Sequence, residues 1–145
     1  MLFRSPDWKD NFTLYTSDIR KVPQSAHMRF YLANHISSEE YIAEAKDSLT
    51  ARKYRLEAIA QLDTAIRIYP EYSEAYQRRA FILFSMKNYE AAEPDFKKAL
   101  TLNPSDAVAN NNYGTLLFDR NRFDEARQHF ETAVRYNPQI GRAHV

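Results

Sequence analysis

The sequence predicts an all-α protein, built of antiparallel helix pairs that stack on one another, with about seven helices. Three observations lead to this fold class. Only two of the 145 residues are glycine, which disfavours a β sandwich or barrel with many tight hairpins. Prolines recur at equal intervals along the chain, at Pro70, Pro104 and Pro138. Apolar residues before each proline recur in steps of three and four, which is the spacing of one helix face.

Each of these prolines closes a helix that belongs to a repeated unit. The segments 99–104 and 133–138 have similar sequences, and the same apolar face precedes both. Small alanines on that face allow two helices to cross closely, and a phenylalanine fills the space beside them. The proline then stops the helix and keeps the residue before it out of the helical region. The sequence therefore resembles itself when shifted by the interval between these prolines, and such a repeat predicts stacked helix–turn–helix units. The repeated faces are Tyr89, Ala92, Phe96 and Ala99, and then Phe123, Ala126, Phe130 and Ala133.

The first helix of each unit begins at a recognisable signal. We expect the one in residues 71–104 to start near Tyr72 or Ser73. In the next unit Ser105 is the expected N-cap, and Asp106 is well placed for the helix dipole. Pro94 lies about a turn into its helix, where we expect a mild kink.

The earlier residues fit the repeat less regularly. Residues 24–70 predict one elongated unit, in which 39–55 form helix and the turn falls near Thr50 to Lys53. Residues 1–23, with Trp8, Tyr15, Ile19 and Pro23 at second-helix positions, predict an orphan half-repeat. Residues 139–145 form a tail. This division suggests a piece of a longer protein.

At these residues the chain resembles the tetratricopeptide repeat family, whose pattern is W-x2-L-G-x2-Y, then A-x3-F-x2-A, then P. The sequence departs from the pattern at Arg79, where leucine is usual, and at Asn110, where an aromatic is preferred. The resemblance implies a single domain over 1–145, wound into a right-handed superhelix whose concave surface is lined by the first helices. The matched residues are Tyr76, Ala80, Leu83, Tyr89, Ala92, Phe96, Ala99, Pro104, Gly114, Leu117, Phe123, Ala126, Phe130, Ala133 and Pro138.

The family's groove positions imply a non-catalytic scaffold that binds a protein or an extended peptide segment. Asn112 falls where such repeats often place an asparagine that grips a peptide backbone. The lysine, asparagine and arginine set that clamps the carboxylate of chaperone tails is absent. The implied groove residues are Asn112, Arg78, Tyr31, Asn111, Gln77, Asn34, Thr115 and Phe81, and the same positions also include His27, Phe30, Glu74, Ser85 and Asp119.

A second resemblance covers the segment from Trp8 to Ala26. It is similar to the junction that follows the last membrane span in transmembrane-and-TPR protein O-mannosyltransferases and related bacterial proteins. This resemblance implies an alternative function as the accessory tail of a membrane glycosyltransferase-like parent protein, on the non-cytoplasmic side, where it presents acceptor proteins to a distant active site.

Composition and motifs argue against most other functions. Glycine-rich phosphate loops and thiolate chemistry are excluded by two glycines and no cysteine. A net charge of +1 without a basic block argues against nucleic acid as a partner, and no apolar run is long enough for a membrane span. His35 and Glu39 are too few ligands for a metal, and nothing predicts a cofactor or catalysis. The helix from Phe123 to Tyr136 should expose an apolar side, which predicts dimerisation or a longer native chain.

Overall fold

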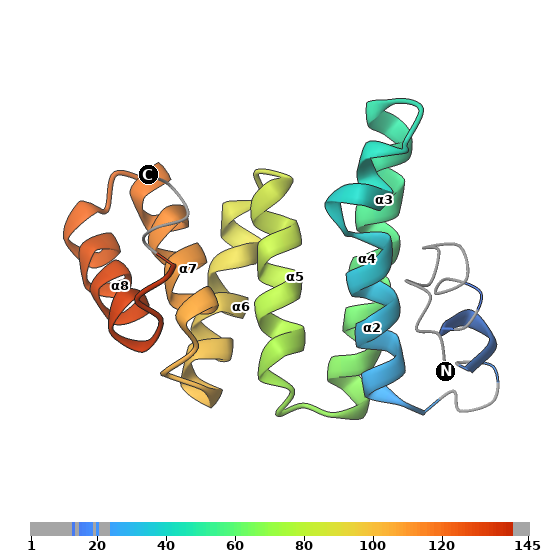
Figure 1. Ribbon diagram of the computed structural model, residues 1–145, viewed down its shortest axis with the longest axis horizontal. Coiled ribbons are helices and arrows are strands. Elements are labelled where there is room, and N and C mark those ends of the chain that lie inside the picture. Colours follow the sequence, from blue (N-terminus) through green and yellow to red (C-terminus); the bar gives the residue numbers. More distant parts are fainter. Residues whose placement is uncertain (1–12, 14, 19, 21–23, 141–145) are drawn as a thin grey trace. The chain divides into compact units, whose positions relative to one another are not determined.

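The computed structural model describes residues 13, 15–18, 20 and 24–140, and within them the chain is helical with no strand. The predicted all-α class is therefore confirmed. The chain divides into two compact units, residues 1–71 and 72–145, and each is described by itself. The labelled helices (Figure 1) are α2 (Ala26–Ile36), α3 (Glu39–Ala43), α4 (Ser48–Ile68), α5 (Ser73–Ser85), α6 (Tyr89–Leu102), α7 (Ala107–Asp119) and α8 (Phe123–Tyr136).

The first unit is centred on α2 and α4, which pack side by side (Figure 1). Small residues make this close packing possible, because Ala33 on α2 and Ala58 and Ala65 on α4 are fully buried. Leu62 fills the space beside them and is also fully buried. The alanine face that the sequence predicted before Pro70 is thus the core of this unit.

The connection between α2 and α4 differs from the prediction. A helix over 39–55 with a turn at Thr50 to Lys53 is wrong, because the chain leaves the helix after α3 and α4 begins at Ser48. Local capping explains the difference. The Ser38 hydroxyl accepts a hydrogen bond from the Tyr41 amide, and the Asp47 carboxylate accepts one from the Thr50 amide at 2.7 Å. Each cap satisfies an amide that a continuous helix would pair with a carbonyl, so two helix starts replace one long helix.

The second unit contains two helix pairs, α5 with α6 and α7 with α8. Its core is a cluster of buried side chains that includes Ala80, Ala92, Phe96 and Leu117, as the repeat predicted, together with Leu116. Leu83, Phe84, Tyr89, Leu100 and Phe130 pack against this cluster while remaining partly exposed.

Gly114 allows α7 and α8 to approach closely. A Cβ atom at this position would lie 2.8 Å from a ring carbon of Phe130 and 3.2 Å from the Ala126 carbonyl oxygen. The equivalent residue one repeat earlier is Ala80, which is fully buried. Gly114, which the sequence matches to the glycine of the repeat pattern, therefore lies against the neighbouring helix.

The turns within the two pairs are alike. Lys87 and Asn121 occupy equivalent positions of successive repeats, and both adopt a left-handed conformation, with φ of 63° and 61°. Each turn is closed by paired hydrogen bonds, such as that from the Asn88 amide to the Leu83 carbonyl at 2.9 Å. The left-handed residue reverses the chain while the last carbonyls of the first helix remain hydrogen-bonded.

Helix starts in this unit follow the expectations with one correction. Helix α5 begins at Ser73, as predicted. The N-cap of α7 is Asp106 and not Ser105, because the Asp106 carboxylate accepts from the Ala109 amide at 3.0 Å. Ser105 instead donates to the Asn103 side chain. Helix α6 continues through Pro94 without interruption.

Both departures from the repeat pattern are polar cross-links between helices. Arg79 on α5 donates two hydrogen bonds to the buried Asp95 on α6, at 2.6 and 2.7 Å. Asn110 is 3% exposed, and its amide donates to the carbonyls of Pro104 and Asp106. The Asn110 side-chain oxygen lies 2.9 Å from Nδ1 of His129 on α8. Polar contacts with satisfied partners therefore replace an apolar contact at each position.

Several N-terminal and C-terminal predictions fall outside the described residues. Residues 13, 15–18 and 20 are helical, but Trp8, Ile19 and Pro23 of the expected half-repeat lie outside the described part, as does most of the tail. No described helix is long and apolar enough to cross a membrane.

Candidate functional site

Six of the eight predicted groove residues lie on α5 and α7, the first helices of the two pairs in the second unit. They form three pairs at equivalent positions of the two repeats, and all six are half-buried. Because α5 and α7 contact each other, the six residues belong to neighbouring helices. We call this surface the α5–α7 face: Gln77 with Asn111, Arg78 with Asn112, and Phe81 with Thr115.

Packing on the opposite side of each helix orients this face. On α7, the residues Ala109, Tyr113 and Leu117 recur every four positions and are buried. Gly114 and Leu116 widen this buried stripe. The helical period then leaves the remaining positions, those of the α5–α7 face, partly open to solvent.

The α5 side of the face carries a partly buried cation beside an aromatic ring. The guanidinium carbon of Arg78 lies 5.6 Å from the centroid of the Phe81 ring. Burial lowers the pKa of Arg78 from its usual value, although arginine stays charged at any physiological pH. A cation with reduced hydration beside a ring is suited to contact a carboxylate or a second aromatic group.

The α7 side of the face carries amide and hydroxyl groups. Thr115 donates its hydroxyl hydrogen to the Asn111 carbonyl at 2.9 Å, which leaves its oxygen as an acceptor. The side chain of Asn112 makes no hydrogen bond to any described residue. Its amide can therefore donate and accept at the same time, as recognition of a peptide backbone requires.

Sequence reasoning missed one residue of this face. Val108, one turn before Asn112, is 49% exposed and adds an apolar contact next to the amides. The repeat could have indicated it, because Val108 is the equivalent of Glu74 in the preceding repeat, and Glu74 is one of the implied groove residues.

The other two predicted groove residues, Tyr31 and Asn34, lie on α2 in the first unit. Tyr31 is 48% exposed, and its ring stacks on that of Tyr15 with centroids 6.1 Å apart. Asn34 is half-buried. The structure describes these two residues within their own unit, so their place in a common groove stays a prediction.

The metal-ligand candidates and the acidic pairs lie near helix ends. His35 lies in the last turn of α2 whereas Glu39 begins α3, so the pair does not share a helix. Within the described residues no group of three His, Asp or Glu side chains is placed to hold a metal. The acidic pairs Glu39-Glu40 and Asp124-Glu125 occupy the first turns of α3 and α8, where they favour the helix dipole.

The fold and the repeated face define a helical-repeat protein. Residues 73–106 and residues 107–140 each match the family model of the tetratricopeptide repeat. The second unit therefore consists of two tetratricopeptide repeats.

Curated relatives match over part of the chain. Human Tetratricopeptide repeat protein 16 is 34% identical over 90 residues, which cover 57% of this chain and 10% of the relative. A rice DnaJ protein (Oryza sativa subsp. japonica) is 31% identical over 88 residues, which cover 61% of this chain and 18% of the relative. This chain thus spans less than a fifth of the length of either relative.

A thermophilic tetratricopeptide repeat protein of Thermus thermophilus superposes with a TM-score of 0.77 at 20% identity, over 88% of this chain and 64% of that chain. At this identity the match shows the fold alone. The comparisons do not support the membrane glycosyltransferase alternative, and most of the segment that suggested it, including Trp8, lies outside the described residues. That alternative, the location of the chain and the absence of catalysis stay predictions.

Proposed function

We propose that this chain is a scaffold that binds an extended segment of another protein on the α5–α7 face. One observation carries the proposal: equivalent positions of two contacting helices carry a cation, a ring and an amide on α5 and amide and hydroxyl groups on α7, and all are half-buried. Binding positions that repeat from one helix to the next suit an extended peptide, because its backbone groups also repeat along the chain. The family assignment agrees, since these repeats typically bind proteins or peptides.

Backbone recognition would be centred on Asn112. An extended peptide has N–H and C=O groups without internal partners, and one amide side chain can pair with both. Asn111 and Gln77, next to the central pair on each helix, can add further hydrogen bonds. This contact is independent of the peptide's sequence and would supply affinity rather than selectivity.

Selectivity would come from Arg78 and Phe81. Because Arg78 is already partly shielded from water, pairing it with a carboxylate costs less further desolvation than pairing an exposed cation would. The ring of Phe81 offers an apolar contact beside that charge. We therefore expect preferred peptides to carry an acidic residue next to an apolar one.

An array of short unstructured peptides, with and without aspartate or glutamate, supplies the probe. The tightest binder is then titrated by calorimetry against the unmodified protein and against the double variant Arg78→Ala, Asn112→Ala. Loss of one charge-assisted contact and one amide contact should weaken binding at least about tenfold, equivalent to about 1.4 kcal/mol.

Arg120→Ala is the matched control, because Arg120 is exposed at the C-terminal end of α7 and lies outside the α5–α7 face. It should bind like the unmodified protein. Unchanged affinity in the double variant, with its helical content intact, would reject the α5–α7 face as the binding site.

A further inference from the structure

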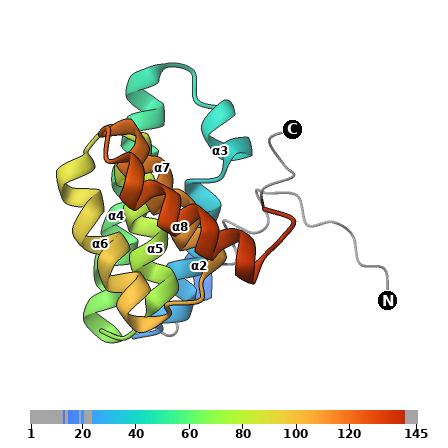
Figure 2. The ribbon, with the colours of Figure 1, turned by 90° about the vertical axis from the view of Figure 1, so that its left-hand side faces the viewer.

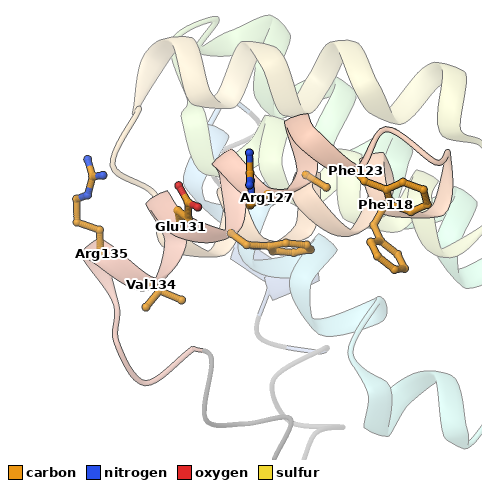
Figure 3. A pocket seen from close by; sticks show the side chains of 8 residues that line it. Phe118, Phe123, Arg127, Glu131, Val134 and Arg135 are labelled. Atoms are coloured by element: carbon orange, nitrogen blue, oxygen red, sulfur yellow. The ribbon is translucent and has the colours of Figure 1, made fainter.

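A second surface of the protein is formed by the outer side of α8. Phe118 and Phe123, at one end, are 55% and 53% exposed, and the centroids of their rings are 5.2 Å apart. Val134, at the other end, is 45% exposed. Phe130, Arg127 and Glu131 lie between these ends, around a hollow of about 600 Å³ (Figure 3). We call these six residues the α8 outer face. Phe118 lies near the end of α7, and the other five residues lie on α8, which is labelled in Figure 2.

The preceding repeat shows what kind of group covers such a face. Phe96 on α6 is the equivalent of Phe130, one repeat earlier. Phe96 is fully buried, and the ring of Tyr113 on α7 stacks on it with the two ring centroids 5.8 Å apart. In the described part of the chain no helix covers Phe130 in the same way. The α8 outer face thus has the composition of a surface that packs against a helix.

The charges on this face indicate which helix. Arg127 and Glu131 lie one turn apart, near the middle of α8. Parallel packing of two α8 helices would place arginine beside arginine and glutamate beside glutamate. Antiparallel packing centred near residues 128 and 129 instead places Arg127 beside the partner's Glu131, and Glu131 beside the partner's Arg127. Two-fold symmetry forms this opposite-charge contact twice.

The apolar ends match in the same arrangement. Antiparallel packing places Phe123 opposite the partner's Val134, and symmetry repeats that contact at the other end. Arg127 has a competing neighbour in Asp124, but the two groups are 3.8 Å apart, and their side chains are 70% and 96% exposed. An ion pair this exposed contributes little and would not oppose the exchange of partners.

We propose that a second copy of this chain docks on the α8 outer face, with the two α8 helices antiparallel. The proposal does not depend on peptide binding, because the α5–α7 face involves other residues. It gives the scaffold two identical peptide-binding faces in one particle, which would let it engage a ligand with two copies of its target segment.

Sedimentation equilibrium over a wide concentration range tests the docking directly. The unmodified protein should form dimers at higher concentration, and Val134→Asp should weaken dimerisation at least about tenfold by burying a charge without a partner. Val108→Asp is the matched control, because Val108 is a similarly exposed valine of the same unit on α7. It should dimerise normally while changing peptide binding, which separates failure of one proposal from failure of the other.

Charge reversal tests the antiparallel orientation. Arg127→Glu and Glu131→Arg should each dimerise at least about tenfold more weakly alone, because each brings like charges together. Mixing these two variants should restore a dimer, and so should combining both substitutions in one chain. A protein that stays monomeric throughout, a dimer unaffected by Val134→Asp, or single variants that the mixture does not rescue would overturn the proposal.

Discussion

Glu93 on α6 joins three of the four helices of the second unit to one another. Its carboxylate accepts a hydrogen bond from the Tyr113 hydroxyl on α7 at 3.0 Å and from Arg122, the N-cap of α8, at 2.7 Å. The Lys97 ammonium, which is on α6 as well, lies 2.9 Å from a carboxylate oxygen of Glu93. Substituting Glu93→Gln removes the negative charge but keeps the size of the side chain, so it tests the electrostatic part of this junction.

The size of the effect follows from the pKa of Glu93. Burial favours the neutral acid, but the hydrogen bonds from Arg122, Lys97 and Tyr113 outweigh it and lower the pKa from 4.5 to about 2. A shift of this size corresponds to about 3 kcal/mol if solvent does not screen it. Because the Arg122 and Lys97 side chains are 33% and 58% exposed, screening reduces the expected loss in Glu93→Gln to about 1 to 2 kcal/mol.

The stabilisation by Glu93 should depend on pH in a definite direction. The folded-state pKa lies below the unfolded value, so the stabilisation is complete above about pH 4.5 and is lost as the pH falls towards 2. Urea unfolding followed by circular dichroism should therefore show a difference between Glu93→Gln and the unmodified protein at pH 7 that disappears near pH 2. Glu125→Gln is the control, since Glu125 is 53% exposed and contacts Arg122 alone among these groups. Equal stability at pH 7, or a difference that persists at pH 2, would refute the reasoning.

Two further predictions concern the same unit. Asp95→Asn should destabilise it by about 2 to 3 kcal/mol in urea unfolding, because the Arg79 guanidinium loses its charged partner where the side chains are only 21% and 11% exposed; an effect below about 0.5 kcal/mol would contradict this. Lys87→Gly should be more stable than Lys87→Ala by about 1 kcal/mol in thermal unfolding, because only glycine adopts the φ of 63° without strain. Comparison with alanine removes the effect of the lysine's own contacts with Phe84 and Tyr89. Equal stability of the two variants would show that the turn is not strained.

Local sequence signals located most helices but not the break between α3 and α4. The regular proline spacing placed the ends of α6 and α8 correctly, because proline cannot continue a helix whatever surrounds it. The caps at Ser38 and Asp47 were missed, because serine and aspartate also occur inside helices and only their bonded amides identify them as caps.

The candidate site was likewise predictable only in part. The helical period and the repeat were enough to place Arg78 and Asn112 at equivalent positions of one face, and the structure shows both half-buried there. The ring contact between Arg78 and Phe81 was not predictable, because it depends on side-chain conformations rather than on spacing.

The sequence by itself determined the class of fold and the small residues on each helix face, because these depend on neighbours within one or two turns of the chain. The equal spacing of the prolines determined the repeat length. The tertiary structure alone decided the partners of the unusual polar residues: Arg79 with Asp95, Asn110 with His129, and Glu93 with Tyr113 and Arg122. Each pair joins residues at least 16 positions apart, on different helices or at the N-cap of one. A buried polar group requires a partner, but the partner is chosen by how the helices pack, which spacing within one helix does not specify.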